Sequence, residues 1–192
     1  MDLVERKKMI RQMIMYNRDV IDQQERLSMD QSVFERLTNS KEFNDAESIF
    51  IFVSFRSEVD THRIIQKAID LGKRVCVPKI EKKSEGMTPY QIQSLDQLEE
   101  GYYGVLEPKY GCELCDKETI DLIIMPGLAF DAKGGRVGYG GGFYDHFINS
   151  METSVRKLAI AYDFQVLDKV PMGENDQLVD QIITDQRVID CK

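Results

Sequence analysis

The chain has little of several things that whole classes of protein depend on. Its 192 residues include four cysteines, which is few for a secreted protein built on disulfides. No apolar run is long enough to span a bilayer, and the charged N-terminus lacks the apolar segment of a signal peptide. Lys and Arg number 25 against 33 Asp and Glu, so the net charge of −8 disfavours nucleic acid. We therefore expect a cytoplasmic protein with no nucleic-acid or membrane partner.

The composition is that of a globular protein with a sizeable core. Hydrophobic residues make up 42% of the chain, too many for a disordered protein. The length favours one domain, which we expect to span residues 1–192. Nothing in the sequence indicates an obligate interface between subunits, so a monomer is the default expectation.

Two of the cysteines, Cys112 and Cys115, form a C-x-x-C motif. One such pair is half of a zinc site, and the only histidines, His62 and His146, do not supply the other half. A redox pair would normally open a helix beside a strand, whereas this motif lies in a segment without clear periodicity. An inert loop is the favoured interpretation, with zinc binding and redox chemistry as alternatives.

Apolar residues near the start of the chain recur at helical spacing, which predicts a long N-terminal helix from Leu3 to about Leu27. A capping box that begins at Ser28 is expected to separate it from a second helix. Asp60 or Thr61 is expected to cap a third. The helices are thus expected at about residues 3–27, 28–37, 61–72 and from 143 onward.

Continuous apolar runs of the kind found in strands buried on both faces alternate with these helices. This order predicts an α/β fold: an open, mostly parallel sheet with helices on both faces, in a Rossmann-like three-layer arrangement. The strands are expected at residues 48–54, 74–78, 121–125, 156–161 and 180–184. In the less clear part, an edge strand is expected at residues 87–92, a helical turn at 95–99 and a loop at 101–104.

The most informative segment runs from Met125 to Asp145. It carries glycine at positions 134, 135, 138, 140, 141 and 142, with Arg136 among them. Glycines let backbone N–H groups close on an anion, and Arg136 can add a planar fork of donors. Asp145, in the first turn of the next helix, could hold a metal ion that bridges phosphate oxygens. Since ligands of such sheets bind beyond the carboxyl ends of the strands, this loop and the loop of Glu58 should lie on the same edge.

Common phosphate-binding motifs do not fit this segment. A Walker A loop requires lysine where Gly141 stands, and a dinucleotide fingerprint requires a third glycine where Phe143 stands. A plain glycine-rich connection is the remaining alternative. It is disfavoured because every glycine costs conformational entropy on folding.

The segments at residues 125–131 and 135–145 resemble the signature of 5-formyltetrahydrofolate cyclo-ligase, also called methenyltetrahydrofolate synthetase. The resemblance covers nearly the whole chain and includes Lys7–Arg11, Ser54–Thr61 and Glu174–Asp176. It implies an ATP- and Mg²⁺-dependent ring closure. ATP would phosphorylate the formyl oxygen of 5-formyltetrahydrofolate, and attack by N10 would then give 5,10-methenyltetrahydrofolate, ADP and phosphate.

The resemblance also implies roles for individual residues. Arg136 would be catalytic, by neutralising charge on the transferring phosphoryl group. Asp145 and Asp176 would bind Mg²⁺; from the residues alone, a helix-dipole partner and a turn residue are the alternatives. Lys7 and Arg11 lie four apart on one helix face and could reach one ligand, or form a solvated basic helix end. The residues assigned to ATP are Lys7, Lys8, Met9, Ile10, Arg11, Arg136, Val137, Gly138, Tyr139, Gly140, Gly141, Gly142, Phe143 and Tyr144.

On the folate side the resemblance assigns Val53, Glu58 and Tyr139. A carboxylate at Glu58 suits the donor-rich edge of a pterin, although a surface loop is the commoner fate of a glutamate. Tyr139 could stack on a folate ring or pack in the core. Some members of the family carry lysine where this chain has Gly141, so the cation that meets the γ-phosphate stays open between Lys133, Arg136 and a residue from Lys7–Arg11.

Overall fold

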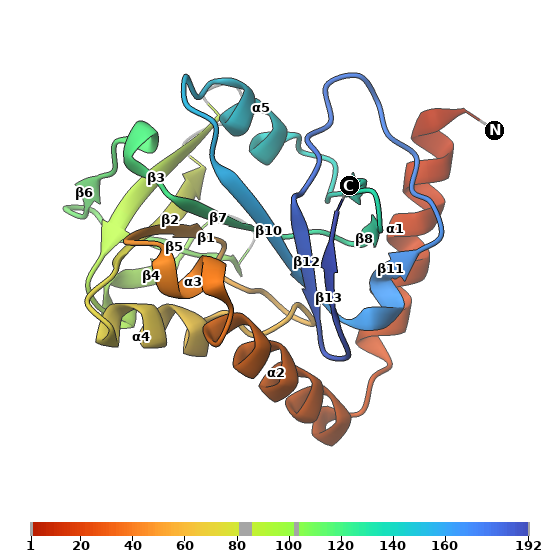
Figure 1. The fold of residues 1–192 in the computed structure, drawn as a ribbon, viewed down its shortest axis with the longest axis horizontal. Helices are drawn as coiled ribbons and strands as arrows, with labels where there is room; N and C mark the ends of the chain where they lie inside the picture. Colours follow the sequence, from red (N-terminus) through yellow and green to blue (C-terminus); the bar gives the residue numbers. More distant parts are fainter. Residues whose placement is uncertain (1, 81–85, 102–103, 192) are drawn as a thin grey trace.

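The computed structural model describes residues 2–80, 86–101 and 104–191, and these residues are built around one large sheet (Figure 1). Its strands lie in the order β13-β12-β10-β7-β1-β2-β3-β6. Neighbouring strands from β12 to β2 are parallel, whereas β13, β3 and β6 pair antiparallel, which confirms an open, mostly parallel sheet. In that order the strands are Val188–Asp190, Gln181–Thr184, Arg156–Ala161, Leu122–Met125, Ser48–Ile51, Arg74–Ile80, Met87–Ile92 and Glu113–Leu114.

The central strands are buried on both faces because their apolar runs feed two separate cores. Side chains of a strand alternate between the faces of the sheet. In β1, Ile49 and Ile51 enter one hydrophobic cluster, while Phe50 enters the other. In β7, Ile124 joins the first cluster and Ile123 the second. The continuous apolar pattern therefore correctly predicted strands covered on both sides.

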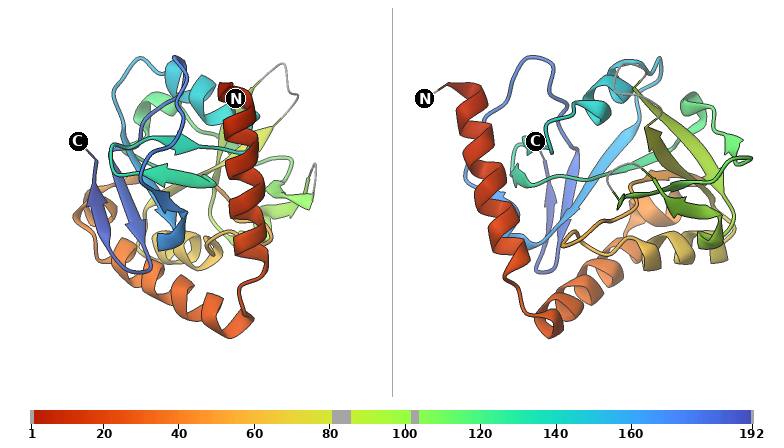
Figure 2. Two further views of the ribbon diagram at one scale, coloured as in Figure 1. Left: turned by 90° about the vertical axis from the view of Figure 1, so that its right-hand side faces the viewer. Right: turned by 180° about the vertical axis from the view of Figure 1, so that it is seen from behind.

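Helices cover both faces, as expected from the sequence. Helices α2, α3 and α4 lie below the sheet in Figure 1 and contribute to the first cluster, while α5 lies above it and contributes to the second. The long helix α1 lies beside strands β8 and β9 rather than on the large sheet (Figure 2). The helices are α1 (Leu3–Asp19), α2 (Gln23–Thr38), α3 (Lys41–Asp45), α4 (His62–Asp70) and α5 (Phe143–Asn149).

The boundary between the first two helices differs from the prediction. The first helix ends at Asp19, not near Leu27, and the second begins at Gln23. Asp22 is the N-cap, since its carboxylate accepts a hydrogen bond from the backbone N–H of Gln24 at 2.9 Å. Ser28 therefore lies inside α2. Two capping signals six residues apart compete in the sequence, and the earlier one operates.

Several short elements were missed or placed differently by the sequence patterns. Helix α3 was not predicted, nor were β6 and β13, which become the outermost strands of the large sheet. Residues 87–92 do form a strand, but β6 pairs outside it, so its predicted edge position was wrong. The short elements are β4 (Leu98–Glu100), β5 (Leu106–Pro108), β8 (Ala129–Asp131), β9 (Arg136–Val137), β11 (Val166–Leu167), and 3₁₀ turns at Leu95–Gln97, Lys117–Thr119 and Asp163–Gln165.

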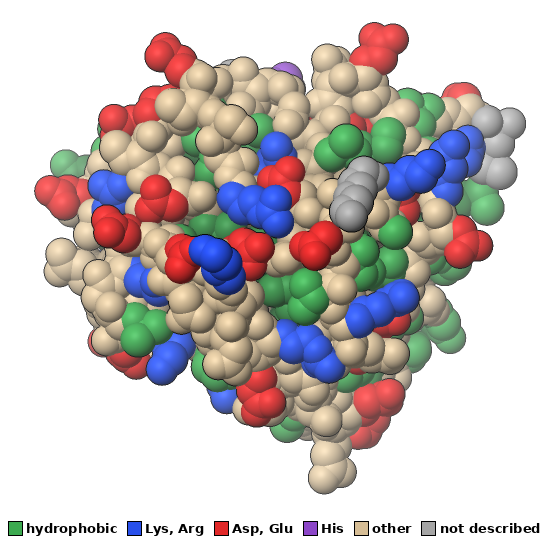
Figure 3. Space-filling model, in the orientation of Figure 1, with side chains coloured by type: hydrophobic (Ala, Val, Ile, Leu, Met, Phe, Trp, Pro, Cys, Tyr) green, Lys and Arg blue, Asp and Glu red, His purple; other side chains and the backbone are tan. Residues whose placement is uncertain are grey.

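The loop expected at residues 101–104 lies partly outside the described residues. The helical turn expected at residues 95–99 is shorter, because β4 begins at Leu98 and pairs with β5 in a hairpin. Within the described ranges, no helix is both long and apolar enough to cross a membrane. On the face seen in Figure 3, acidic and basic side chains are interspersed rather than gathered into separate patches.

The C-x-x-C motif does not act as a pair. Cys115 forms a disulfide with Cys76 in β2, with their Cα atoms 6.5 Å apart, and Cys112 is a free thiol. The favoured interpretation of the motif as an inert loop was therefore wrong for Cys115. The link joins the segment after β6 to an inner strand of the large sheet. The partner of Cys115 lies 39 residues earlier in the chain, so local spacing could not identify it.

Candidate active site

Strand β9 divides the glycine-rich segment into a hairpin turn and a loop, whereas the sequence had suggested a single loop. Strands β8 and β9 pair antiparallel, and the turn between them contains Gly134 and Gly135. The carboxylate of Asp131 organises this turn by accepting from the backbone N–H groups of Lys133 and Gly135, each at 3.0 Å. It also accepts from the N–H of Val170 at 2.9 Å. The remaining glycines form the loop that leads into α5.

Arg136 is a buried cation at the start of this loop, with 6% of its surface exposed. Its Nη2 donates to Oδ1 of Asp145 at 2.7 Å, and its Nη1 donates to the carbonyl of Pro126 at 3.2 Å. Among the described residues its buried Nε–H has no acceptor. A Cβ on Gly138 would lie 2.8 Å from Nη1, so the absence of a side chain there leaves room for the guanidinium.

Asp145 and Asp176 are brought to the same place although 31 positions separate them. Oδ1 of Asp145 accepts from the backbone N–H of Gln177 at 2.9 Å, so the residue after Asp176 is bonded to it. Oδ2 of Asp176 accepts from the N–H of Gly173 at 2.6 Å and pairs with Nζ of Lys7. Burial alone would raise the pKa of Asp176, but these donors hold it below its usual value.

Helix α1 supplies cations to the same region. Lys7 reaches Asp176, and Nε of Arg11 donates to the carbonyl of Gly138 at 2.8 Å. The same guanidinium lies against Gly140, where a Cβ would stand 3.4 Å from its Cζ. Ile14, on this face of α1, is fully buried against β8 and β9. The helix is thus held by its apolar side with two of its basic residues directed at the glycine loop.

The loop itself has the conformation of an anion cradle. Gly140 and Gly142 have φ values of +103° and +70°, which side-chain-bearing residues rarely adopt. No backbone N–H from Gly140 to Gly142 donates to another residue in the described part of the chain. Exposed N–H groups beside a buried arginine suit phosphate oxygens.

The folate-side candidates meet this loop through Tyr139. The Tyr139 hydroxyl donates to Oε1 of Glu58, and Oε2 of Glu58 accepts from the backbone N–H of Phe55 at 2.8 Å. Nη1 of Arg18 donates to the same hydroxyl at 2.9 Å. Tyr139 is 46% exposed as a residue, so it is not a core residue. The expectation that the two loops share one edge of the sheet is confirmed.

The environment of Glu58 weakens its acidity. Burial raises the pKa of its carboxyl, while the bonds from Tyr139 and Phe55 and the charge of Arg18 act in the opposite direction. Burial also raises the pKa of Tyr139 far above its usual value, so its hydroxyl stays protonated and can act as a donor. A carboxylate flanked by donors is a site for paired N–H groups of a ligand.

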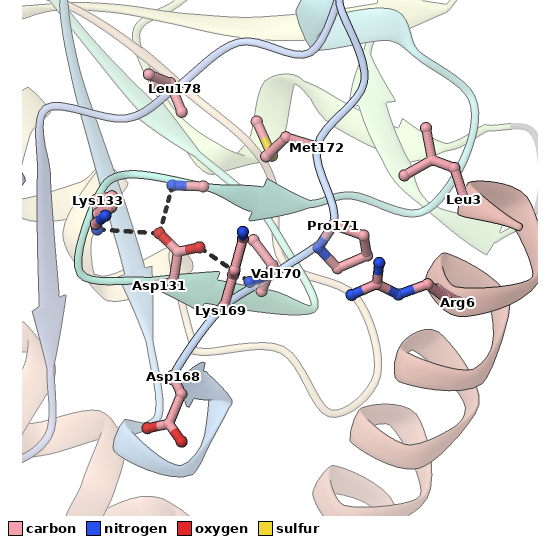
Figure 4. Close-up of a pocket in the computed structure, with 11 residues that line it drawn as sticks. Leu3, Arg6, Asp131, Lys133, Asp168, Lys169, Val170, Pro171, Met172 and Leu178 are labelled. Carbon is pink, nitrogen blue, oxygen red and sulfur yellow. Dashed lines mark hydrogen bonds between the residues drawn. The ribbon is translucent and has the colours of Figure 1, made fainter. Parts of the chain in front are cut away.

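A cavity of about 490 Å³ adjoins the β8–β9 hairpin (Figure 4). It lies between the first turn of α1, the β8–β9 turn and the segment at residues 168–172. Its floor includes the Asp131 turn, and Met172, which lines it, accepts from the N–H of Arg136 through its sulfur at 3.2 Å. The lining is mixed, with apolar Leu3, Val170, Pro171, Met172 and Leu178 beside charged Arg6, Asp131, Lys133, Asp168 and Lys169.

Other residues assigned from the resemblance lie less directly at the site. Lys8 is exposed and Met9 is 55% exposed, and in the described part of the chain neither side chain makes a hydrogen bond to the glycine loop. Val53 is only 3% exposed and packs in the first core cluster beneath the Glu58 loop. Ile10 packs beside Ile14, and the hydroxyl of Tyr144 is buried without a partner among the described residues.

The carboxylates of Asp145 and Asp176 fit a magnesium ion that also binds phosphate. In the described ranges no cluster of three or more His, Cys, Asp or Glu side chains could hold a metal ion unaided. Mg²⁺ usually keeps water ligands and takes one or two carboxylates together with substrate phosphates. Asp145 and Asp176 supply two hard carboxylates beside the loop, which matches that requirement.

The family model for 5-formyltetrahydrofolate cyclo-ligases matches residues 4–185. The chain belongs to the 5-formyltetrahydrofolate cyclo-ligase family. A relative from Caenorhabditis elegans, a probable 5-formyltetrahydrofolate cyclo-ligase, is 31% identical over 88% of this chain and 87% of its own. The Escherichia coli K12 5-formyltetrahydrofolate cyclo-ligase is 29% identical over 92% and 98%. These members of the family match the resemblance drawn from the motifs.

A solved structure agrees with this assignment. The NMR structure of 5,10-methenyltetrahydrofolate synthetase from Aquifex aeolicus superposes with a TM-score of 0.85, at 28% identity, over 96% of this chain and 92% of its own. The Mycoplasma pneumoniae 5,10-methenyltetrahydrofolate synthetase has the same fold, with a TM-score of 0.75 at 20% identity. The cyclo-ligase family is therefore supported by sequence and fold together.

Two site residues were missed from the sequence. Arg18 contacts Tyr139, and the backbone of Gln177 contacts Asp145. Arg18 could have been found, because Lys7, Arg11 and Arg18 fall on one face of the predicted helix. Gln177 could not, because a backbone donor leaves no signal in side-chain identity.

Proposed function

We propose that this enzyme catalyses the ATP- and Mg²⁺-dependent conversion of 5-formyltetrahydrofolate to 5,10-methenyltetrahydrofolate, with release of ADP and phosphate. The observation that carries the proposal is the position of Tyr139. It belongs to the glycine loop, yet its hydroxyl bonds Glu58 on the neighbouring loop. A phosphate held by the loop and a pterin held by Glu58 would therefore lie next to each other, as phosphoryl transfer to the formyl group requires.

ATP would occupy the loop and the adjoining cavity. The free N–H groups of Gly140–Gly142 would take phosphate oxygens, with Lys7 and Arg11 supplying positive charge from α1. The 490 Å³ cavity is in the range of small-ligand pockets and is lined by Gly135, the residue before Arg136, so it has room for the nucleoside. Lys133, at the rim of the cavity, is a further cation within the same region.

The proposed reaction needs stabilisation of charge on the phosphoryl group and no covalent intermediate with the protein. The formyl oxygen attacks the γ-phosphorus, and the bond from that phosphorus to the β,γ-bridging oxygen breaks to release ADP. N10 attacks the formyl carbon and loses its proton, and the phosphorylated oxygen departs as phosphate. Arg136, held by Asp145, would neutralise the charge that develops on the transferring group. Asp145 and Asp176 would hold Mg²⁺, which would supply further neutralisation of phosphate charge.

Glu58 would hold the pterin and fix the position of the formyl group. Its carboxylate can accept paired N–H bonds from the pterin edge, while the half-exposed residue Tyr139 can stack its ring on the folate. Two loops and one helix would thereby place both substrates next to each other.

The test is a turnover assay with the purified protein. We expect the near-ultraviolet band of 5,10-methenyltetrahydrofolate to rise when 5-formyltetrahydrofolate, ATP and Mg²⁺ are all present, and not when any one is omitted. ADP should form in equal amount. Ligand binding without any rise in this band would contradict catalysis and indicate a protein that only sequesters folate or nucleotide.

A further inference from the structure

Helix α1 touches both halves of the site with one of its faces. Lys7 pairs with Asp176 and Arg11 bonds the glycine loop, whereas Arg18 reaches Tyr139 on the folate side. Lys7 and Arg18 are 11 residues apart, which corresponds to about 16 Å along a helix axis. The N-terminal half of α1 therefore serves the phosphate side and its last turn serves the folate side.

The last turn of α1 is fastened to the loop that carries Glu58. Oγ of Ser57 donates to the carboxylate of Asp19 at 2.5 Å. Arg18, one residue earlier, is 5% exposed, and its Cζ lies 5.8 Å from the centroid of the Tyr139 ring. Its buried Nε–H has no acceptor among the described residues. The hydrogen bond that its side chain makes goes to the Tyr139 hydroxyl, so the buried guanidinium faces the folate side of the site.

The direction of the hydrogen bonds follows from the chemistry of the donors. A guanidinium can only donate, so Tyr139 must accept from Arg18 with a lone pair of its hydroxyl. The single hydroxyl proton is then free to point at the carboxylate of Glu58, which can only accept when ionised. Without Arg18, the hydroxyl could rotate and Glu58 would lose a fixed donor.

We infer that Arg18 is a positioning residue of the folate subsite: through Tyr139 it holds the Glu58 carboxylate ready to accept the N–H groups of the pterin. This inference rests on the proposed function, because it takes a folate as the ligand of Glu58. The side chain of Arg18 bonds the Tyr139 hydroxyl, which is the atom that meets Glu58, and not the glycine backbone of the phosphate side. Its effect should therefore appear in folate binding and leave ATP binding nearly unchanged.

Because Arg18 is a charged group beside Glu58, its proposed role predicts a change in the pH at which the Glu58 carboxylate is protonated. The groups that face its carboxylate are Arg18 from α1, Tyr139 from the glycine loop and Tyr144 from α5, and only Arg18 is charged. Burial raises the pKa of Glu58, and Arg18 opposes that rise. Loss of Arg18 would raise the pKa further, so the carboxylate would be protonated, and lost as an acceptor, at a higher pH than in the wild type.

The experiment compares Arg18→Gln with a matched control, Arg26→Gln. Arg26 is the neighbouring arginine that donates to the carbonyl of Arg18 at 3.1 Å, so both variants remove one positive charge from the same region. We expect Arg18→Gln to raise the Kd for 5-formyltetrahydrofolate, measured calorimetrically without ATP, about tenfold at neutral pH. The Kd for a non-hydrolysable ATP analogue should change less than about twofold, and Arg26→Gln should leave both constants near wild type.

The pH profile of kcat/KM distinguishes a residue that positions Glu58 from one that only stabilises the fold. The acid limb of kcat/KM for the folate should move to higher pH in Arg18→Gln and move back in Arg18→Lys, which restores the charge. An unmoved acid limb, or equal losses of folate and ATP affinity, would overturn the inference. If the wild type binds folate but does not turn over, the proposed function fails while the binding comparison still decides the role of Arg18.

Tyr139→Phe keeps the test decisive if Arg18→Gln does not fold. It removes only the hydroxyl between Arg18 and Glu58, and it should shift the acid limb in the same direction. Where both variants fold, their combination should cost little more in folate affinity than the larger single effect, because both break one chain of bonds. Additive losses would show that Arg18 acts independently of Tyr139 and would overturn the inference.

Discussion

Nη2 of Arg136 lies 2.7 Å from Oδ1 of Asp145, and this ion pair joins β9 to the first turn of α5. The same oxygen accepts from the backbone N–H of Gln177 at 2.9 Å. Asp145 therefore does more than offer a carboxylate to a metal ion. It also balances a buried guanidinium and fixes the C-terminal segment that carries Asp176.

This double use of Asp145 makes the choice of substitution important. Asp145→Asn keeps an oxygen for the bond from Gln177 but removes the charge, so we expect kcat to fall about 100-fold or more. Asp145→Ala should lose activity as well and should also lower the free energy of unfolding by about 3 kcal/mol, because it strands Arg136. Steady-state kinetics and thermal unfolding of both variants measure the two effects.

The neighbouring His146 provides the control for Asp145. It is exposed, and in the described structure it makes no side-chain hydrogen bond, so His146→Ala should leave both kcat and the unfolding temperature unchanged. A wild-type kcat in Asp145→Asn would remove the catalytic role assigned to this carboxylate.

Arg136 should act mainly on the chemical step. Arg136→Ala removes the charge next to the transferring group, so we expect kcat to fall about 100-fold or more, with a smaller change in KM for ATP. Arg136→Lys keeps the charge but cannot bond Pro126 and Asp145 together with a planar fork, so it should rescue only part of the rate. If only KM changes, Arg136 binds ground-state ATP and does not stabilise the transition state.

The sequence predicted the parts of the fold that depend on local pattern. The inner strands β1, β7 and β10 were found because each contains a short continuous apolar run. Such a run is typical of a strand that is buried on both faces of a sheet. The break between α1 and α2 was misplaced because Asp22 and Ser28 are both acceptable caps, and Asp22 is the one that caps α2. Strand β9 was hidden because only two residues separate the glycines around it.

The sequence predicted which loops form the site, but not which of their side chains pair with one another. The rule that ligands bind beyond the carboxyl ends of the strands placed the glycine loop near Glu58, and the bond from Tyr139 confirms it. The pairing of Lys7 with Asp176 joins residues 169 positions apart, so only the folded chain shows it. The resemblance to a family suggested roles for both residues but not that they touch.

The Lys7–Asp176 pair gives a prediction with a pH signature. The pKa of Asp176 is held below its usual value, so the pair stabilises the fold at neutral pH and this contribution is lost as the pH falls through that lowered pKa. Lys7→Met should therefore destabilise the protein at neutral pH and less so in acid, where Asp176 is protonated in both proteins. Denaturant unfolding at several pH values measures the difference.

The exposed neighbour Lys8 supplies a control that changes the same charge. Lys8→Met should not alter unfolding at any pH, because the structure gives Lys8 no partner among the described residues. Lys7→Met should also raise KM for ATP about tenfold, since it removes a cation beside the glycine loop. A destabilisation that stays constant down to acid pH would mean that Lys7 acts by packing and not by pairing with Asp176.

The disulfide between Cys76 and Cys115 should stabilise the side of the sheet that carries β3 and β6. It closes a segment with a sequence separation of 39, for which loop-closure entropy predicts about 4 kcal/mol. Reduction, or Cys115→Ser, should therefore lower the unfolding temperature, while Cys112→Ser should match the wild type under oxidising and reducing conditions alike. The site lies at other strands, so kcat of the folded protein should change little. Equal unfolding temperatures for oxidised and reduced wild type would show that the close packing of Cys76 and Cys115, and not the covalent bond, holds this edge of the sheet.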